Sequence, residues 1–184
     1  MDPVLKKKLL FISPLAVFSV MVILLFTGLG KDPTQLESQL IGKPIPEFER
    51  VTLMDTNQRV TDKDIKGPAL LNVFASWCPS CYTEHPYLMQ LQSQKAVTIY
   101  GLNYKDTVPK GLKFINDLGD PYDTIIFDEN GRLGIELGVY GAPETFVINA
   151  ENKIIYRHVG VVTDRVWQEL IKPMLVDDLK GNTP

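Results

Sequence analysis

The chain has 184 residues, of which 45% are hydrophobic and 22% charged, a composition typical of a globular protein with one domain core. Its formal net charge of −3 gives no basic surface for phosphate groups, so we expect no nucleic acid partner. From Ile41 onward the sequence contains no internal repeat, low-complexity tract or long block of like charges.

The N-terminus carries a long apolar segment. Residues 9–30 form an uncharged run of 22 residues, and a helix needs about 20 such residues to span a bilayer. Lys6, Lys7 and Lys8 precede this run, so the positive-inside rule places residues 1–8 in the cytoplasm and the rest beyond the membrane. We therefore predict one transmembrane signal-anchor helix over 9–30. A cleaved signal peptide is the alternative, but its apolar core is typically about 7 to 15 residues long and ends at an A-x-A-like site.

The remaining chain divides into a polar tether over residues 31–39, a globular domain over 40–177 and a C-terminal tail over 178–184. Within the domain, apolar patterns predict the order β-α-β-α-β, followed by a β-hairpin and a last helix. The expected strands cover residues 47–53, 69–75, 97–102, 124–127, 145–148 and 153–158, and the expected helices 60–66, 82–94, 110–118, 133–137 and 164–176. This order predicts an α/β fold with a central mixed sheet flanked by helices.

The two cysteines of the chain both lie in the motif Cys78-Pro79-Ser80-Cys81, directly after the strand predicted at 69–75. A framework of structural disulfides is therefore absent, although the compartment beyond the membrane permits one. Pro79 suits the first turn of a helix, where its missing N–H would be unpaired anyway. We conclude that Cys78 sits at a helix N-terminus and that the pair serves redox chemistry or a metal.

The position of the two cysteines predicts their roles in disulfide exchange. Thiolate is the nucleophile, and a helix N-terminus stabilises an anion through its unpaired N–H groups and partial positive charge. Cys78, at the exposed entry to the helix, is therefore the expected attacking thiol. Cys81 lies one turn further in, where it can resolve the mixed disulfide.

Other uses of the motif are less well supported by the sequence. A zinc site, or a metal-binding chaperone, would need further ligands such as His85 and His158. We instead expect His85 to be a surface or groove residue and His158 a packing or exposed strand residue, with no metal bound. A thiol peroxidase would need an arginine near its cysteine, and none flanks this motif.

Two segments carry a resemblance to a known family. The run Trp77-Cys78-Pro79-Ser80-Cys81 after a buried strand, and the later run 138–146 (GVYGAPETF), resemble the DsbE/CcmG family of thiol–disulfide interchange proteins. The likeness extends from about residue 40 to residue 160 and includes the N-terminal anchor. It implies a thioredoxin-like fold, tethered to the bacterial inner membrane with its domain in the periplasm.

The resemblance also implies where a substrate binds. In thioredoxin-like folds the bond corresponding to Ala142–Pro143 is cis and lies beside the disulfide, where the backbone pairs with an extended substrate segment. Sequence alone would predict trans, since about 5–6% of X-Pro bonds in folded proteins are cis. Trp77, Ala142, Pro143 and Glu144 are therefore the expected substrate-binding residues.

The family likeness further suggests that Glu84 and Glu144 make the surroundings of the cysteines acidic. At the place of the buried carboxylate of general thioredoxins this chain has Asn72, which leaves Glu84 as the candidate acid–base group. A solvated helix position is the alternative for Glu84.

An acidic surrounding would oppose deep stabilisation of the thiolate and favours a reductant, in agreement with the family. The resemblance implies no cofactor. Its expected acceptor is oxidised apocytochrome c or a cytochrome c maturation thiol protein, and its expected donor is a membrane thiol reductant. A general periplasmic thiol–disulfide oxidoreductase without cytochrome specificity remains the alternative.

Overall fold

The computed structural model describes residues 3–28 and 40–179 of the chain, which divides into two compact units between Leu36 and Glu37. The first unit contains helix α1 (Pro3–Gly28). Within the described ranges, no helix combines the length and the apolar character needed to cross a membrane. The predicted tether and the last two residues of the predicted anchor, 29 and 30, lie outside the described residues.

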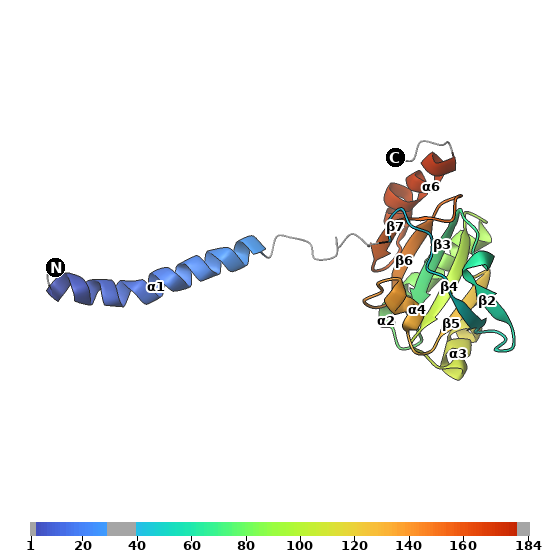
Figure 1. Cartoon of the computed structure of the whole chain (residues 1–184), viewed down its shortest axis with the longest axis horizontal. Coiled ribbons are helices and arrows are strands. Elements are labelled where there is room, and N and C mark those ends of the chain that lie inside the picture. The colour runs from blue at the N-terminus through green and yellow to red at the C-terminus, as the bar shows by residue number, and fades with distance from the viewer. Residues whose placement is uncertain (1–2, 29–39, 180–184) are drawn as a thin grey trace. The chain divides into compact units, whose positions relative to one another are not determined.

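The second unit is built on one seven-stranded sheet with the strand order β2-β1-β5-β4-β3-β6-β7 (Figure 1). Strands β3, β4 and β5 are parallel, and β1, β2, β6 and β7 add to the sheet in antiparallel pairs. The strands are β1 (Glu49–Thr52), β2 (Arg59–Thr61), β3 (Ala69–Phe74), β4 (Thr98–Tyr104), β5 (Thr124–Asp128), β6 (Glu144–Ile148) and β7 (Ile154–Val159). The predicted mixed sheet is confirmed.

Helices cover both faces of this sheet. They are the 3-10 turn η1 (Asp62–Asp64), α2 (Pro79–Ser93), α3 (Val108–Leu118), α4 (Arg132–Glu136), α5 (Asp164–Val166), the π-helical turn η2 (Trp167–Ile171) and α6 (Lys172–Leu179). Side chains of α2, α3 and the C-terminal helices share one core cluster that includes Leu88, Phe114 and Trp167. Side chains of α4 and of the segment before β1, such as Leu133 and Phe48, share the other cluster. The two clusters form the two sides of a three-layer domain.

Alternation along β3 divides its side chains between these clusters. Leu70 and Phe74 belong to the cluster under α2, whereas Leu71 and Val73 belong to the opposite cluster. Asn72 therefore points to the α2 side, because successive side chains of a strand face opposite ways.

Two sequence predictions need correction. The short turn of helix expected at 60–66 covers only 62–64, where it is a 3-10 turn, and residues 60 and 61 belong to β2, which pairs with β1. The Asp64 carboxylate accepts hydrogen bonds from the backbone N–H and hydroxyl of Thr61 at 2.8 and 2.7 Å. The two strands form a hairpin across a six-residue loop, and the pattern within 60–66 alone did not show this pairing. At the other end, α6 continues to Leu179, two residues into the predicted tail.

Candidate functional site

The cysteine motif joins the end of β3 to the start of α2. Cys78 is the N-cap of this 15-residue helix, and Pro79 occupies its first turn. Cys78 and Cys81 form a disulfide with their Cα atoms 5.4 Å apart. The backbone N–H of Cys81 donates a hydrogen bond to Cys78 Sγ at 3.1 Å. Cys78 thus takes the place of a capping Ser or Asp, where free N–H groups and the helix dipole favour a negative charge.

The two cysteine residues do not differ in burial. Cys78 and Cys81 are each 2% exposed, because both pack into the core cluster on the α2 side of the sheet. The prediction that Cys78 is exposed was therefore wrong. What distinguishes the two thiols is their position on the helix.

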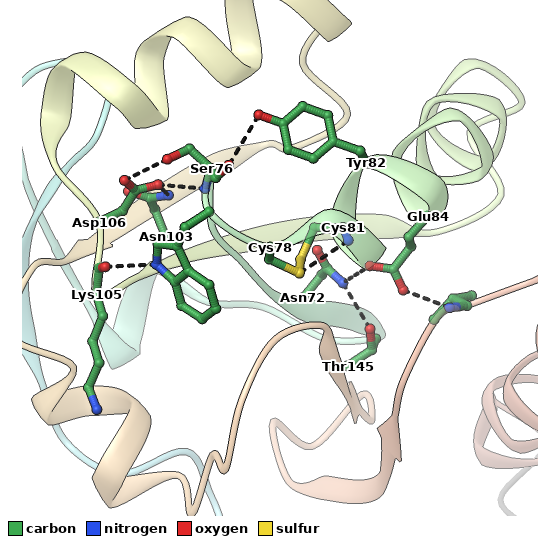
Figure 2. Close-up of a disulfide and its surroundings, with 12 residues drawn as sticks. Asn72, Ser76, Cys78, Cys81, Tyr82, Glu84, Asn103, Lys105, Asp106 and Thr145 are labelled. Carbon is green, nitrogen blue, oxygen red and sulfur yellow. Dashed lines mark hydrogen bonds between the residues drawn. A yellow bond between two sulfur atoms is a disulfide. The ribbon is translucent and has the colours of Figure 1, made fainter.

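A clamp from the loop after β4 holds the segment that precedes Cys78 (Figure 2). The Asp106 carboxylate accepts hydrogen bonds from the backbone N–H of Ser76 at 2.7 Å and from its hydroxyl at 2.8 Å. It also accepts from Asn103 at 3.2 Å, and the Trp77 indole N–H donates to the Lys105 carbonyl at 2.9 Å. Sequence reasoning missed Asp106. The sequence could have pointed to Asp106 because it follows a strand parallel to the one that precedes the motif. Both segments therefore lie at the same end of the sheet.

Glu84 is buried in a hydrogen-bonded group on the α2 side of the sheet (Figure 2). Its carboxylate accepts from Asn72 Nδ2 at 2.9 Å and from the backbone N–H of Val162 at 2.6 Å. Asn72 also donates to the Thr145 hydroxyl at 3.0 Å and accepts from the Tyr122 hydroxyl at 2.9 Å. Burial raises the pKa of Glu84 from 4.5 to about 7, and the two hydrogen bonds only partly offset that effect. The solvated alternative for Glu84 was wrong.

The Ala142–Pro143 bond is cis, as the family resemblance implied. Val73 of β3 pairs with Glu144 of β6, so Pro143 lies at the end of the sheet from which β3 enters the motif. The Pro143 carbonyl accepts from the backbone N–H of Gly160 at 3.0 Å, which ties this loop to the end of β7.

Glu144 does not add net charge beside the disulfide. It is 1% exposed and forms a buried ion pair with Arg157, whose Nη2 lies 2.7 Å from Glu144 Oε2. Thr145 faces Asn72, so Glu144, one residue earlier in the strand, faces the opposite side of the sheet. The expectation of an acidic surrounding therefore rests on Glu84. Of the other predicted substrate-binding residues, Trp77 is 52% exposed at the start of the motif, and Ala142 packs against both core clusters.

The two histidines do not join the cysteines in a metal site. His85 is buried, with Nε2 2.9 Å from the Gly119 carbonyl and its ring edge-on to Phe114, so the expected surface position was wrong. His158 is half-buried in β7, with Nε2 3.2 Å from the Val161 carbonyl. Burial lowers the pKa of both rings. Among the described residues, no three His, Cys, Asp or Glu side chains gather as possible metal ligands.

Comparison with known proteins agrees with this geometry. The Redoxin family matches residues 40–170. The "Thiol:disulfide interchange protein DsbE" of Vibrio cholerae is 50% identical over 176 residues, which cover 92% of this chain and 95% of that protein. The protein of the same name from Pseudomonas aeruginosa is 46% identical over 169 residues, with coverage of 91% and 93%, and that from Escherichia coli K12 is 46% identical over 178 residues, with coverage of 92% and 95%.

Solved structures share the fold. A thioredoxin family thiol:disulfide interchange protein from Chlorobium tepidum has a TM-score of 0.59 at 27% identity, covering 72% of this chain and 95% of that one. A secreted thiol-disulfide isomerase from Corynebacterium glutamicum, at 22% identity, has a TM-score of 0.62 and covers 72% and 85%. A thioredoxin-like domain, a disulfide-bonded pair of cysteines at a helix N-terminus and this degree of identity lead to one conclusion: the chain is a thiol–disulfide oxidoreductase and belongs to the DsbE family of thiol:disulfide interchange proteins.

Proposed function

We propose that this chain is a membrane-anchored reductant of protein disulfides, with Cys78 as the attacking thiol and Cys81 as the resolving thiol. The observation that carries the proposal is the position of Cys78 as the N-cap of α2, with its sulfur accepting the N–H of Cys81. In the reduced state the same N–H group and helix terminus stabilise a thiolate on Cys78. Cys81, within the first turn, has the poorer position for this charge.

The proposed exchange transfers two electrons from the chain to its partner. The Cys78 thiolate attacks one sulfur of the partner's disulfide, that bond breaks, and the partner's other sulfur leaves as a thiolate that takes up a proton. Cys81 then loses its proton and attacks Cys78 Sγ. The Cys78–Cys81 disulfide forms, and the partner's second sulfur leaves and is protonated in turn.

Glu84 is the proposed acceptor of the proton that Cys81 loses. It lies one helical turn after Cys81, on the same buried side of the sheet, and its pKa near 7 lets it both take and return a proton at neutral pH. Asn72 and the Val162 N–H hold the carboxyl group in place. Trp77, Ala142 and Pro143 are the proposed residues of the surface that receives the partner, and Glu144, which is 1% exposed, supports that surface from within the fold.

A carboxylate near the cysteines supports reduction over oxidation. A thiol pKa of about 3.5 instead of about 7 would stabilise the reduced form by roughly 4 to 5 kcal/mol, or about 100 mV, and an ionised Glu84 opposes such stabilisation. We expect the chain to equilibrate with glutathione at a potential more negative than the roughly −120 mV of a strong oxidant. A potential as high as that would contradict the reductant role.

The proposed setting is the periplasmic face of the inner membrane. The uncharged run 9–30, preceded by three lysines, supports an anchor. A reductant in an oxidising compartment must be recharged, so the proposal includes a membrane-embedded thiol donor. The acceptor suggested by the family resemblance is the oxidised haem-binding C-x-x-C-H segment of apocytochrome c, or another maturation thiol protein.

A peptide assay tests the acceptor. The reduced chain should reduce an oxidised C-x-x-C-H peptide faster than a peptide in which the same residues are reordered around the two cysteines. Equal rates would favour a general oxidoreductase instead. Deleting the gene should then abolish holocytochrome c, and normal holocytochrome levels would contradict the cytochrome role.

A further inference from the structure

The loop that enters β6 is held from behind by an arginine on the neighbouring strand. In β7, Arg157 stands opposite Phe146 in the β6–β7 register, and its guanidinium lies 5.8 Å from the Phe146 ring centroid. Phe146 belongs to the core cluster on the side of the sheet opposite the disulfide. Arg157 therefore cannot touch the reacting sulfurs, and any effect on the reaction has to pass through the loop.

Arg157 and the loop meet at the two oxygens of one carboxylate. Both Nε and Nη2 of Arg157 lie against Glu144 Oε2, at 2.8 and 2.7 Å. Glu144 Oε1 accepts the backbone N–H groups of Tyr140 at 2.8 Å and Gly141 at 3.0 Å. The Arg157 and Glu144 side chains are 5% and 1% exposed, so water does not screen this ion pair. Glu144 thus links a fixed strand residue to the backbone just before cis Pro143.

The same guanidinium also supports an exposed aromatic ring. Its carbon lies 4.8 Å from the centroid of the Tyr140 ring, within the range of a cation–π contact. Tyr140 is nevertheless 74% exposed. A large exposed aromatic side chain that is held in place is typical of a binding surface, because little conformational entropy is lost when it is covered.

We propose that Arg157 is a positioning residue for partner recognition: it fixes the Tyr140–Pro143 loop through Glu144 and presents the Tyr140 ring to a protein partner. The proposal rests on the function proposed above. The partner it implies is an extended disulfide-bearing segment with an apolar or aromatic side chain near its cysteines, able to pack on Tyr140. A small disulfide reaches the sulfurs without using this loop.

The test compares a protein disulfide with a small one, using the full chain in mild detergent. The variants are Arg157→Lys, which keeps the charge but loses the planar group that stacks on Tyr140 and binds Glu144, and Tyr140→Ala, which removes the ring. Arg165→Lys is the matched control, since Arg165 makes an exposed pair with Glu169 at 2.9 Å. Substrates are an oxidised C-x-x-C-H peptide, insulin as a second protein disulfide, and hydroxyethyl disulfide.

We expect Arg157→Lys and Tyr140→Ala each to raise KM for the peptide and for insulin about five- to tenfold, the scale of a lost cation–π contact. The rate with hydroxyethyl disulfide and the potential against glutathione should change less than about twofold, and the double variant should be little worse than Arg157→Lys alone. Unchanged protein reduction, or equal losses with hydroxyethyl disulfide, would overturn the role of Arg157. If the unaltered chain does not reduce the peptide but does reduce insulin, the acceptor proposed above is wrong. The comparison of the variants with insulin then still tests the role of Arg157.

Discussion

Glu84→Gln replaces a buried carboxyl group by a neutral amide of nearly the same size, and its effect on stability should depend on pH. The pKa of Glu84 is about 7 in the folded protein and about 4.5 when the side chain is free in water. The folded state therefore binds the proton of the Glu84 carboxyl group more tightly than the unfolded state does. The stability that this protonated group contributes is fully present below about pH 4.5 and is lost as pH rises through about 7. A difference of about 2.5 pH units corresponds to about 3 kcal/mol.

The variant also loses one hydrogen bond at every pH. Glu84 accepts from Asn72 on one oxygen and from the Val162 N–H on the other, whereas glutamine has a single acceptor oxygen. This loss costs about 1 to 3 kcal/mol. The diagnostic is therefore the slope of stability against pH and not the stability at one pH.

The assay is urea unfolding of the globular unit, residues 37–184, with the disulfide intact, between pH 4.5 and pH 8. Relative to Glu84→Gln, the unaltered protein should lose about 3 kcal/mol of unfolding free energy across this range. Glu169→Gln, which changes an exposed carboxylate in a surface ion pair, should keep the slope of the unaltered protein. Parallel curves for the unaltered protein and Glu84→Gln would show that Glu84 ionises normally, and its proposed proton transfer would then lose its basis.

Three further predictions concern the motif and its supports. Cys81→Ser should accumulate covalent adducts with partner proteins on non-reducing gels and Cys78→Ser few, whereas the reverse pattern would assign the nucleophile to Cys81. Pro143→Ala should slow the reduction of protein disulfides more than that of a small disulfide, because the loop meets protein partners; equal losses would instead indicate a folding defect. Asp106→Ala should destabilise the oxidised domain by about 1 to 3 kcal/mol in thermal or urea unfolding, since it leaves the half-buried N–H of Ser76 without its charged acceptor, and an unchanged midpoint would refute the clamp.

The local sequence was sufficient for much of the fold because the relevant signals are short-range. The apolar run at 69–75 and the motif after it predicted β3 and the start of α2, since a buried strand and a proline in the first helical turn are both local patterns. The short turn of helix expected at 60–66 was confirmed at 62–64 only. Its residues 60 and 61 belong to a strand that exists because β1 lies beside it.

The sequence by itself supplied the residue types and their spacing: two cysteines in one motif at a predicted helix N-terminus are suited to disulfide exchange or to metal binding. Only the tertiary structure decided the environment of that chemistry. It buried both cysteines, paired Glu144 with Arg157 on the side of the sheet opposite the disulfide, and buried Glu84, which raises the pKa of that carboxyl group to about 7. The physical reason is that burial and charge pairing depend on residues brought together from distant parts of the chain, as Asn72, Glu84 and Val162 are, and no local pattern contains that information.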